Sequence, residues 1–341
     1  MKKNIYLVHC AAMIVFFLTV CGGGCIAAPM KKMNDVDGHI IEVPTNAKRV
    51  VVLNSNALEA LLILDATNVV AGVFSDVGKY DWLYPHVKQI PLVGRWSAPN
   101  MEVISKLNPD VIITYRKNPS DMLEKQASLF GICVVRLDLH NLETFDAELK
   151  ILATMLGKEK EANRFLRWKK NINKQGDRIL QGTKKRPTIY VENFVPYKSL
   201  GRGSAGFEMM RKIGARSITN EFKTPYPFVG DEWILAKNPD VIVKVPGGAP
   251  AGKSLQVIRH QMEERPLWGD LQAVKKGRLG VLHTTLFSGP RGVIGRLYLI
   301  KWCHPEKSKG LDVERIHKEY YQLFLREPYG GVWIISPGGG K

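Results

Sequence analysis

Short apolar runs alternate with longer amphipathic segments along most of this chain. Four runs in its first half, at residues 50–53, 69–74, 111–114 and 132–137, hold few polar residues and do not alternate strictly between apolar and polar positions. Such runs are typical of strands that are buried on both faces of a parallel sheet. Residues 56–64, between the first two runs, have the length and apolar content of a buried helix. The pattern therefore predicts parallel strands that are separated by helices.

The same rhythm returns in the second half of the chain. Strands are expected at residues 188–191, 241–245 and 280–282, and helices at residues 206–213 and, with a break near His304, between residues 296 and 324. A short strand pair is expected at residues 34–44, around the turn dipeptide Asp37-Gly38. With 341 residues, the chain is long enough to bury two such cores.

A long helical stretch separates the two halves. Gly157 is expected to end a first helix, and residues 159–180 then form a second helix about 33 Å long, at ~1.5 Å per residue. The apolar positions of this stretch keep no sustained heptad, which argues against a coiled coil. The predicted fold class is therefore α/β, with two Rossmann-like lobes whose central, mostly parallel sheets are joined by a long interlobe helix. The expected domains are a signal peptide at residues 1–25, an N-terminal lobe at 34–141, linking helices at 142–181 and a C-terminal lobe at 186–337.

One sequence unit occurs twice. Residues 102–113 return as residues 232–243, and each copy runs from a glutamate, Glu102 or Glu232, through an apolar helical turn and Asn-Pro-Asp into a buried strand. The copies begin 130 positions apart (232 − 102), a period that suits two similar lobes better than a solenoid. The residue before each proline is expected to leave the helical region. Matching carboxylates on matching lobes suggest a partner that is itself two-fold.

The N-terminus has the pattern of a secretory signal. Two lysines precede an apolar run, which residues 22–24, all glycine, interrupt before it reaches the ~20 apolar residues of a membrane span. Cys25, or alternatively Cys21, is a candidate for lipid modification, and cleavage after Ala27 without a lipid is the competing outcome. The sequence thus predicts a protein outside the cytoplasm that a lipid anchors to the membrane.

Charge and cysteine content narrow the choice of partner. The formal net charge of +17 suits an anionic ligand or anionic lipid headgroups, whereas the export signal and the lack of a recognised motif argue against nucleic acid.

Cys133 and Cys303 are single cysteines without zinc spacing, so they are expected to be buried and unpaired. The histidines are scattered, and the glycine-rich residues 201–206 lack the lysine of a P-loop. No catalytic residue, metal site or cofactor is predicted.

Aromatic and arginine side chains gather in the loops at the strand ends. In open α/β sheets these loops form the ligand crevice. Rings together with guanidinium groups suit a large planar or anionic ligand, although simple surface exposure remains the alternative for each residue. The candidate ligand-binding residues are Arg95, Trp96, Tyr115, Arg116, Tyr197, Arg202, Tyr226, Phe287 and Arg291.

These features resemble the substrate-binding proteins of ABC importers for cobalamin, ferric siderophores and haem. The resemblance covers about residues 35–324 and is carried by residues 49–59, both Asn-Pro-Asp units and residues 268–278. It implies a monomeric binding protein, not an enzyme, that delivers a small-molecule metal chelate to a permease dimer with its ATPase. It also implies that Glu102 and Glu232 pair with arginines on the two permease subunits.

The resemblance leaves the ligand open. Trp96, Tyr197 and Tyr226 stand where the cobalamin-binding relative contacts its ligand, whereas Arg95 stands where haem-binding relatives place an iron-ligating tyrosine. Arg95, Arg202 and Arg291 together would suit the oxygens of an anionic ferric chelate. An iron-siderophore-like chelate is therefore expected, with a corrinoid, haem, or a role as solute sensor for a membrane kinase as alternatives.

Overall fold

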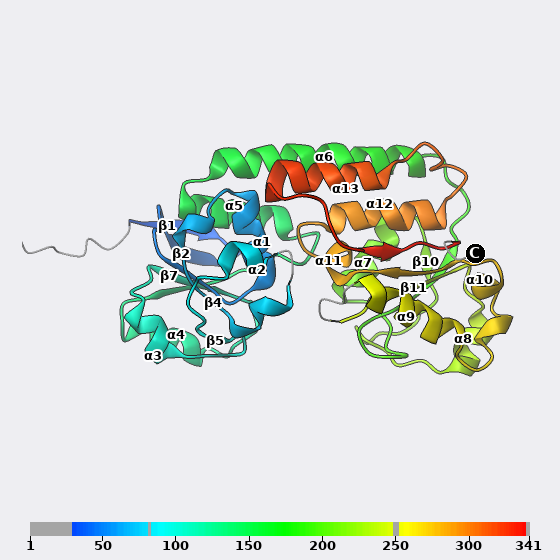
Figure 1. The fold of residues 1–341 in the computed structure, drawn as a ribbon, viewed down its shortest axis with the longest axis horizontal. Coiled ribbons are helices and arrows are strands. Elements are labelled where there is room, and N and C mark those ends of the chain that lie inside the picture. Colours follow the sequence, from blue (N-terminus) through cyan, green and yellow to red (C-terminus); the bar gives the residue numbers. More distant parts are fainter. Residues whose placement is uncertain (1–28, 81–82, 248–251, 339–341) are drawn as a thin grey trace, which may run out of the picture.

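The computed structural model describes residues 29–80, 83–247 and 252–338, so the expected signal peptide and both candidate lipidation cysteines lie outside the described residues. Figure 1 shows two α/β lobes side by side, with the helix α6 (Glu159–Leu180) running along one edge of both. The predicted fold class is confirmed. None of the helices that the described residues form has the length and apolarity needed to cross a membrane.

The N-terminal lobe is built on a four-stranded parallel sheet in the order β4-β3-β7-β8. Its strands are β3 (Val50–Val52), β4 (Val70–Val73), β7 (Val111–Thr114) and β8 (Cys133–Arg136). Two antiparallel hairpins flank the sheet, β1 (Met30–Asn34) with β2 (Ile40–Pro44) and β5 (Gly94–Arg95) with β6 (Ala98–Pro99). The helical elements are α1 (Ser55–Ile63), η1 (Thr67–Val69), η2 (Ser75–Lys79), α2 (Tyr84–Val87), α3 (Met101–Lys106) and α4 (Met122–Ser128).

The C-terminal lobe holds a five-stranded sheet in the order β10-β9-β11-β12-β13, in which only the edge strand β13 runs antiparallel to its neighbour. Its strands are β9 (Thr188–Glu192), β10 (Arg216–Ser217), β11 (Val241–Lys244), β12 (Leu279–Leu282) and β13 (Ile334–Ile335). The helical elements are α7 (Ala205–Lys212), α8 (Asp231–Lys237), α9 (Gly252–Glu263), η3 (Trp268–Asp270), α10 (Gln272–Lys275), α11 (Thr284–Phe287), α12 (Gly292–Cys303), α13 (Val313–Tyr320) and η4 (Tyr321–Leu325).

Two helices link the lobes. Helix α5 (Phe145–Leu156) ends at Gly157, whose φ of 64° is the left-handed conformation that glycine adopts without steric cost. Helix α6 follows and packs against α5 and α1 of the first part of the chain and against α12 of the C-terminal lobe. At Gly176 a Cβ atom would lie 2.9 Å from Ile300 Cδ1, so a larger residue there would require side chains of α12 to shift. The long helix thus packs against both lobes.

The two copies of the repeated unit fold alike. From Met101 to Asp110 and from Asp231 to Asp240, buried and exposed positions follow the same order, with a single difference at Leu107 and Lys237. Asn108 and Asn238 leave the right-handed helical region as expected, and both adopt left-handed φ values, 44° and 40°. Asparagine tolerates this conformation better than most residues.

The aspartate of each copy ties its unit to the first strand of its sheet. The Oδ2 atom of Asp110 accepts the backbone N–H of Lys48 at 2.6 Å and that of Arg49 at 2.9 Å, just before β3. In the same way Asp240 Oδ2 accepts the backbone N–H of Thr188 at 2.8 Å, at the start of β9. Asn-Pro-Asp therefore ends a helix and fixes the entry of a neighbouring strand.

Both cysteines in the described part of the chain are unpaired. Cys303 is buried, as expected, and burial raises the pKa of its thiol to about 12. Cys133 is only half-buried, and burial raises its pKa as well. Neither thiol is set up to be reactive at neutral pH.

Candidate functional site

A cavity of about 410 Å³ lies between the two lobes. The N-terminal lobe contributes residues that follow β3, β7 and β8, and the C-terminal lobe contributes residues that follow β9, β11 and β12. These are the carboxyl ends of parallel strands, where open α/β sheets bind their ligands. The cavity is lined by Ser55, Asn56, Glu59, Tyr80, Tyr115, His140, Asn193, Phe194, Leu200, Gly206, Tyr226, Val245, Thr284, Thr285, Phe287 and Ser288.

Aromatic rings and uncharged polar groups make up most of this lining. Each lobe supplies rings, Tyr80 and Tyr115 from the first and Phe194, Tyr226 and Phe287 from the second. Hydroxyl and amide groups lie between them, and the described lining residues include no lysine and no arginine. Such a surface suits a ligand with apolar faces and hydrogen-bonding edges.

Glu59, the one carboxylate among the described lining residues, is neutralised from the other lobe. Arg291, directly before α12, donates from Nη2 to Glu59 Oε2 at 3.1 Å, and the hydroxyl of Tyr320 donates to Glu59 Oε1 at 2.6 Å. Arg291 is fully buried. Burial alone would lower its pKa, but the Glu59 carboxylate outweighs this effect and the pKa is raised, so the guanidinium stays charged. The pair therefore joins the two lobes through buried opposite charges.

Only some of the residues expected to bind ligand lie at this cavity. Tyr115, Tyr226 and Phe287 line it. Trp96 stands behind Tyr115, with the two ring centroids 5.4 Å apart in an edge-to-face contact. Arg291 is engaged with Glu59, as described above.

The remaining arginines do not converge on the cavity. Arg95 is exposed on the β5 hairpin, and Arg202 donates from Nε to the carbonyl of Asn220 at 3.1 Å. Arg116 forms an ion pair with Asp37 of the β1–β2 turn. The expected arginine cluster around an anionic ligand is therefore not assembled in this structure.

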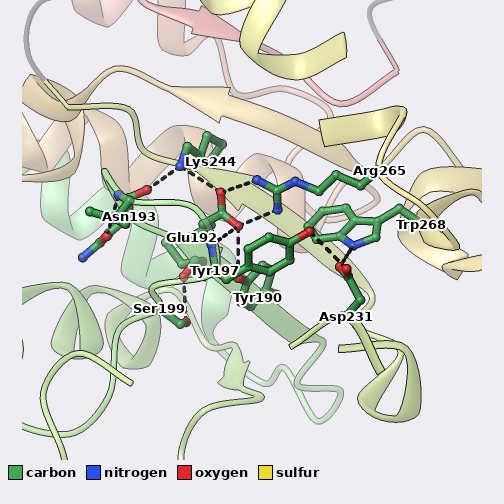
Figure 2. Close-up of polar contacts among 11 residues, drawn as sticks. Tyr190, Glu192, Asn193, Tyr197, Ser199, Asp231, Lys244, Arg265 and Trp268 are labelled. Atoms are coloured by element: carbon green, nitrogen blue, oxygen red, sulfur yellow. Dashed lines mark hydrogen bonds and ion pairs between the residues drawn. The ribbon is translucent and has the colours of Figure 1, made fainter. Parts of the chain in front are cut away.

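Tyr197 belongs to a separate polar network in the C-terminal lobe (Figure 2). Its hydroxyl donates to Asp231 Oδ2 at 3.1 Å, and the guanidinium of Arg265 lies 4.4 Å from its ring centroid. Trp268 donates from Nε1 to the other oxygen of Asp231 at 2.6 Å. Tyr197 therefore faces the first residue of α8 and not the ligand cavity.

Glu192, at the end of β9, is the centre of this network. Its fully buried carboxylate accepts two hydrogen bonds from Arg265, at 2.6 and 2.9 Å, and one from Lys244 at 2.8 Å. Burial by itself would raise the pKa of Glu192, but these cations outweigh it and the pKa is lowered. The pKa of Lys244 is also lowered, because burial outweighs the attraction of Glu192. Arg265 is thus the principal counter-ion.

The two glutamates of the repeated unit are both exposed, in the first turns of α3 and α8. Figure 1 shows these helices at the edge of the molecule away from α6, one in each lobe. Glu102 pairs with Lys106, at 2.7 Å between Oε1 and Nζ. Asn100 caps α3, accepting the backbone N–H groups of Glu102 and Val103.

One group of metal-ligand type, half-buried at Asp35 and exposed at its other two residues, is present in the described part of the chain. Asp35, Asp37 and His39 of the first hairpin bring ligand atoms within 4.8 Å of one another. Their carboxylates are already used: Asp35 Oδ1 accepts the backbone N–H groups of Asp37 and His39, and Asp37 pairs with Arg116. The group is accounted for as a hydrogen-bonded turn.

Several lining residues were not predicted from the sequence. Most of them share only a position after a buried strand, and a small polar residue at such a position has no sequence pattern that distinguishes it from an ordinary loop residue. Glu59 had a clearer signal, since a carboxylate inside the apolar segment 56–64 is expected to have a partner. The lining residues that were missed include Ser55, Asn56, Glu59, Tyr80, His140, Asn193, Phe194, Thr284, Thr285 and Ser288.

Comparisons with known proteins agree with this architecture. The sequence pattern of a family described as periplasmic binding protein matches residues 50–286. The chain is 25% identical to the molybdate-binding protein MolA of Haemophilus influenzae, over 85% of this chain and 89% of the relative. It is 23% identical to the vitamin B12-binding protein of Salmonella typhimurium, over 66% of this chain and 79% of the relative. The crystal structure of the TroA-like periplasmic binding protein FepB from Veillonella parvula superposes with a TM-score of 0.75 at 26% identity, covering 90% of this chain and 99% of that one.

Proposed function

This chain belongs to the periplasmic binding protein family, the extracytoplasmic substrate-binding proteins of ABC importers, and we propose that it captures a metal chelate of low net charge between its lobes. The observation that carries the proposal is the cavity lining. Rings from both lobes can contact the faces of a large ligand, while hydroxyl and amide groups meet its edges. The members of the family are transport proteins and not enzymes.

The charge of the cavity narrows the class of chelate. A polyanionic ligand that leaves water needs compensating cations, and the described lining offers no lysine or arginine. The buried guanidinium of Arg291 contacts the lining residue Glu59 and is already matched by that carboxylate. A corrinoid or a ferric hydroxamate, whose charges are largely balanced within the complex, fits this surface better than a ferric catecholate. The same argument disfavours a compact dianion such as the molybdate that MolA binds.

A thermal-shift series tests the ligand class. Cyanocobalamin, a neutral ferric hydroxamate, a ferric catecholate, haemin and molybdate are compared, and one of the first two is expected to raise the unfolding temperature most. Tyr115→Ala and Tyr226→Ala should each abolish most of that shift, whereas Tyr84→Ala, an exposed tyrosine outside the lining, should not. A larger shift with the catecholate or with molybdate would overturn the assignment.

Docking to the permease is proposed through Glu102 and Glu232. Both side chains are exposed, they occupy matching positions, and the helices that carry them, α3 and α8, lie one in each lobe at the edge away from α6. Exposed charges of this kind orient a complex and speed its formation more than they raise its affinity.

The docking proposal predicts a separation of two activities. The double variant Glu102→Ala with Glu232→Ala should bind ligand as the wild type does. Its rate of uptake should fall by at least about 10-fold, because two charge contacts with the permease are lost. A control variant with Glu42→Ala and Glu306→Ala removes two other exposed glutamates and should transport normally. Normal uptake by the first variant would contradict the docking role.

A further inference from the structure

One segment of the C-terminal lobe carries both a wall of the ligand cavity and a docking glutamate. Tyr226 lines the cavity, and Glu232 follows six positions later (232 − 226) in the first turn of α8. The segment is bonded to the chain that follows β9: Ser199 donates its backbone N–H to Pro227 at 2.8 Å, and Val229 donates to Tyr197 at 3.0 Å. Cavity wall and docking helix therefore form one continuous piece.

Asp231, the first residue of α8, anchors this piece to the core. Its two carboxylate oxygens accept the indole N–H of Trp268 at 2.6 Å and the hydroxyl of Tyr197 at 3.1 Å (Figure 2). The residue before the helix is Gly230, which has no side chain to cap it. The two hydrogen bonds of Asp231 therefore hold the first turn of α8, which also carries Glu232.

Both donors to Asp231 are held in place by the same cation. The guanidinium of Arg265 lies 4.4 Å from the ring centroid of Tyr197 and 4.6 Å from that of Trp268. Its bidentate bond to the buried Glu192 fixes its plane. Lys244 extends the cluster to the cavity, since its Nζ donates to the carbonyl of the lining residue Asn193 at 2.6 Å.

The N-terminal lobe has no such anchor among its described residues. The position that matches Asp231 is Met101, whose side chain accepts no indole or phenol hydrogen bond of this strength. Helix α3 is held instead by the local cap of Asn100, and Glu102 is tied to Lys106. The anchor on the first residue of the helix is therefore found in the C-terminal lobe and not among the described residues of the N-terminal lobe.

We propose that Asp231 is a positioning residue for permease docking, which acts through Glu232 and is itself held by Tyr197 and Trp268. The proposal rests on the proposed role of Glu232 in docking. It assigns Tyr197 to the alignment of the docking face instead of to ligand contact.

A double-mutant cycle tests this assignment without knowledge of the ligand. Docking of the ligand-free protein to its permease–ATPase complex in nanodiscs is measured for wild type, Tyr197→Phe, Glu232→Ala and the combination. Tyr197→Phe should weaken docking about 3- to 10-fold in the wild-type background and have no further effect once Glu232 is gone. A role limited to stability would give the same loss in both backgrounds, which would overturn the proposal.

Two further variants complete the experiment. Asp231→Ala should weaken docking at least as much as Tyr197→Phe, again only while Glu232 is present. Tyr298→Phe removes a buried hydroxyl elsewhere in the same lobe and should leave docking unchanged. If Glu232→Ala itself leaves docking intact, the proposed docking function fails; if it weakens docking while Tyr197→Phe does not, only the positioning role of Asp231 fails.

Discussion

The two copies of the repeated unit share a backbone but differ in what surrounds their glutamates. Both run from an exposed glutamate to a left-handed asparagine and an aspartate that ties down a strand. In the N-terminal lobe the helix is stabilised by contacts within its own turn, Asn100 and Lys106. In the C-terminal lobe it is stabilised by Trp268 and Tyr197, whose rings lie against Arg265, the partner of the buried Glu192. The local sequence specifies the backbone path, whereas each lobe specifies how firmly the helix start is held.

The largest difference between the lobes should come from removing the centre of the buried cluster. Glu192→Ala leaves the buried Lys244 and the mostly buried Arg265 without their counter-ion, so it should lower the free energy of unfolding by about 3–5 kcal/mol. Asn100→Ala, which removes the local cap in the other lobe, should cost about 1 kcal/mol. Urea unfolding of the two variants measures both values. Equal losses would show that the cluster does not stabilise the C-terminal lobe in the way described.

The next largest difference between the lobes is expected in how their stability responds to acid, because a histidine is buried in the C-terminal lobe. Burial and the charge of Arg291 hold the pKa of His317 well below its usual range, and its ring nitrogens have no hydrogen-bond partner among the residues that the structure describes. A histidine that folds neutral contributes its full stability above pH ~6.5 and loses it as the pH falls, by about 2 kcal/mol at pH 5.

His317→Phe keeps a ring among Tyr298, Tyr321 and Trp333 but cannot take up a proton. The loss of unfolding free energy between pH 7 and pH 5 should shrink by that amount in the variant. The neighbouring His283, whose pKa burial lowers to about 3, should retain its own share of the acid sensitivity. An unchanged pH profile would contradict the assignment to His317.

The smallest expected effect is on the ion pair of the N-terminal docking glutamate. Lys106→Ala breaks an exposed contact between side chains that are 72% and 77% accessible, so stability should change by at most about 0.5 kcal/mol. Glu102 would then be unpaired, as Glu232 is in the described structure, and docking should be as strong as in the wild type or slightly stronger. Chemical unfolding and the nanodisc docking assay give the two numbers, and weaker docking would argue against Glu102 as a contact.

The elements were largely predictable from the sequence because their determinants are local. Helix α6 and strand β7 begin and end where the pattern of apolar residues places them, at 159–180 and 111–114. Gly157 ends its helix for a reason that is visible in one residue. The strand-end loops also predicted where a cavity would lie, and Tyr115, Tyr226 and Phe287 line it.

The surroundings of the other candidate residues depend on partners far away in the chain. Arg291 is buried against Glu59, 232 positions earlier, and Tyr197 bonds to Asp231, 34 positions later. An arginine or a tyrosine in a loop has the same local pattern whether it faces a ligand, a carboxylate or solvent. Only the packing of the lobes distinguishes these environments.

The contact between Glu59 and Arg291 bears on whether the chain can be divided. Cutting it between the lobes would expose a group that is now buried on each half-molecule, the carboxyl of Glu59 on one and the guanidinium of Arg291 on the other. Tyr320, from the C-terminal helices, would be missing from the first half as well. Although the sequence repeats a unit in each lobe, we therefore expect each lobe to depend on the other across this contact, and a half expressed alone to be less stable than it is in the whole chain.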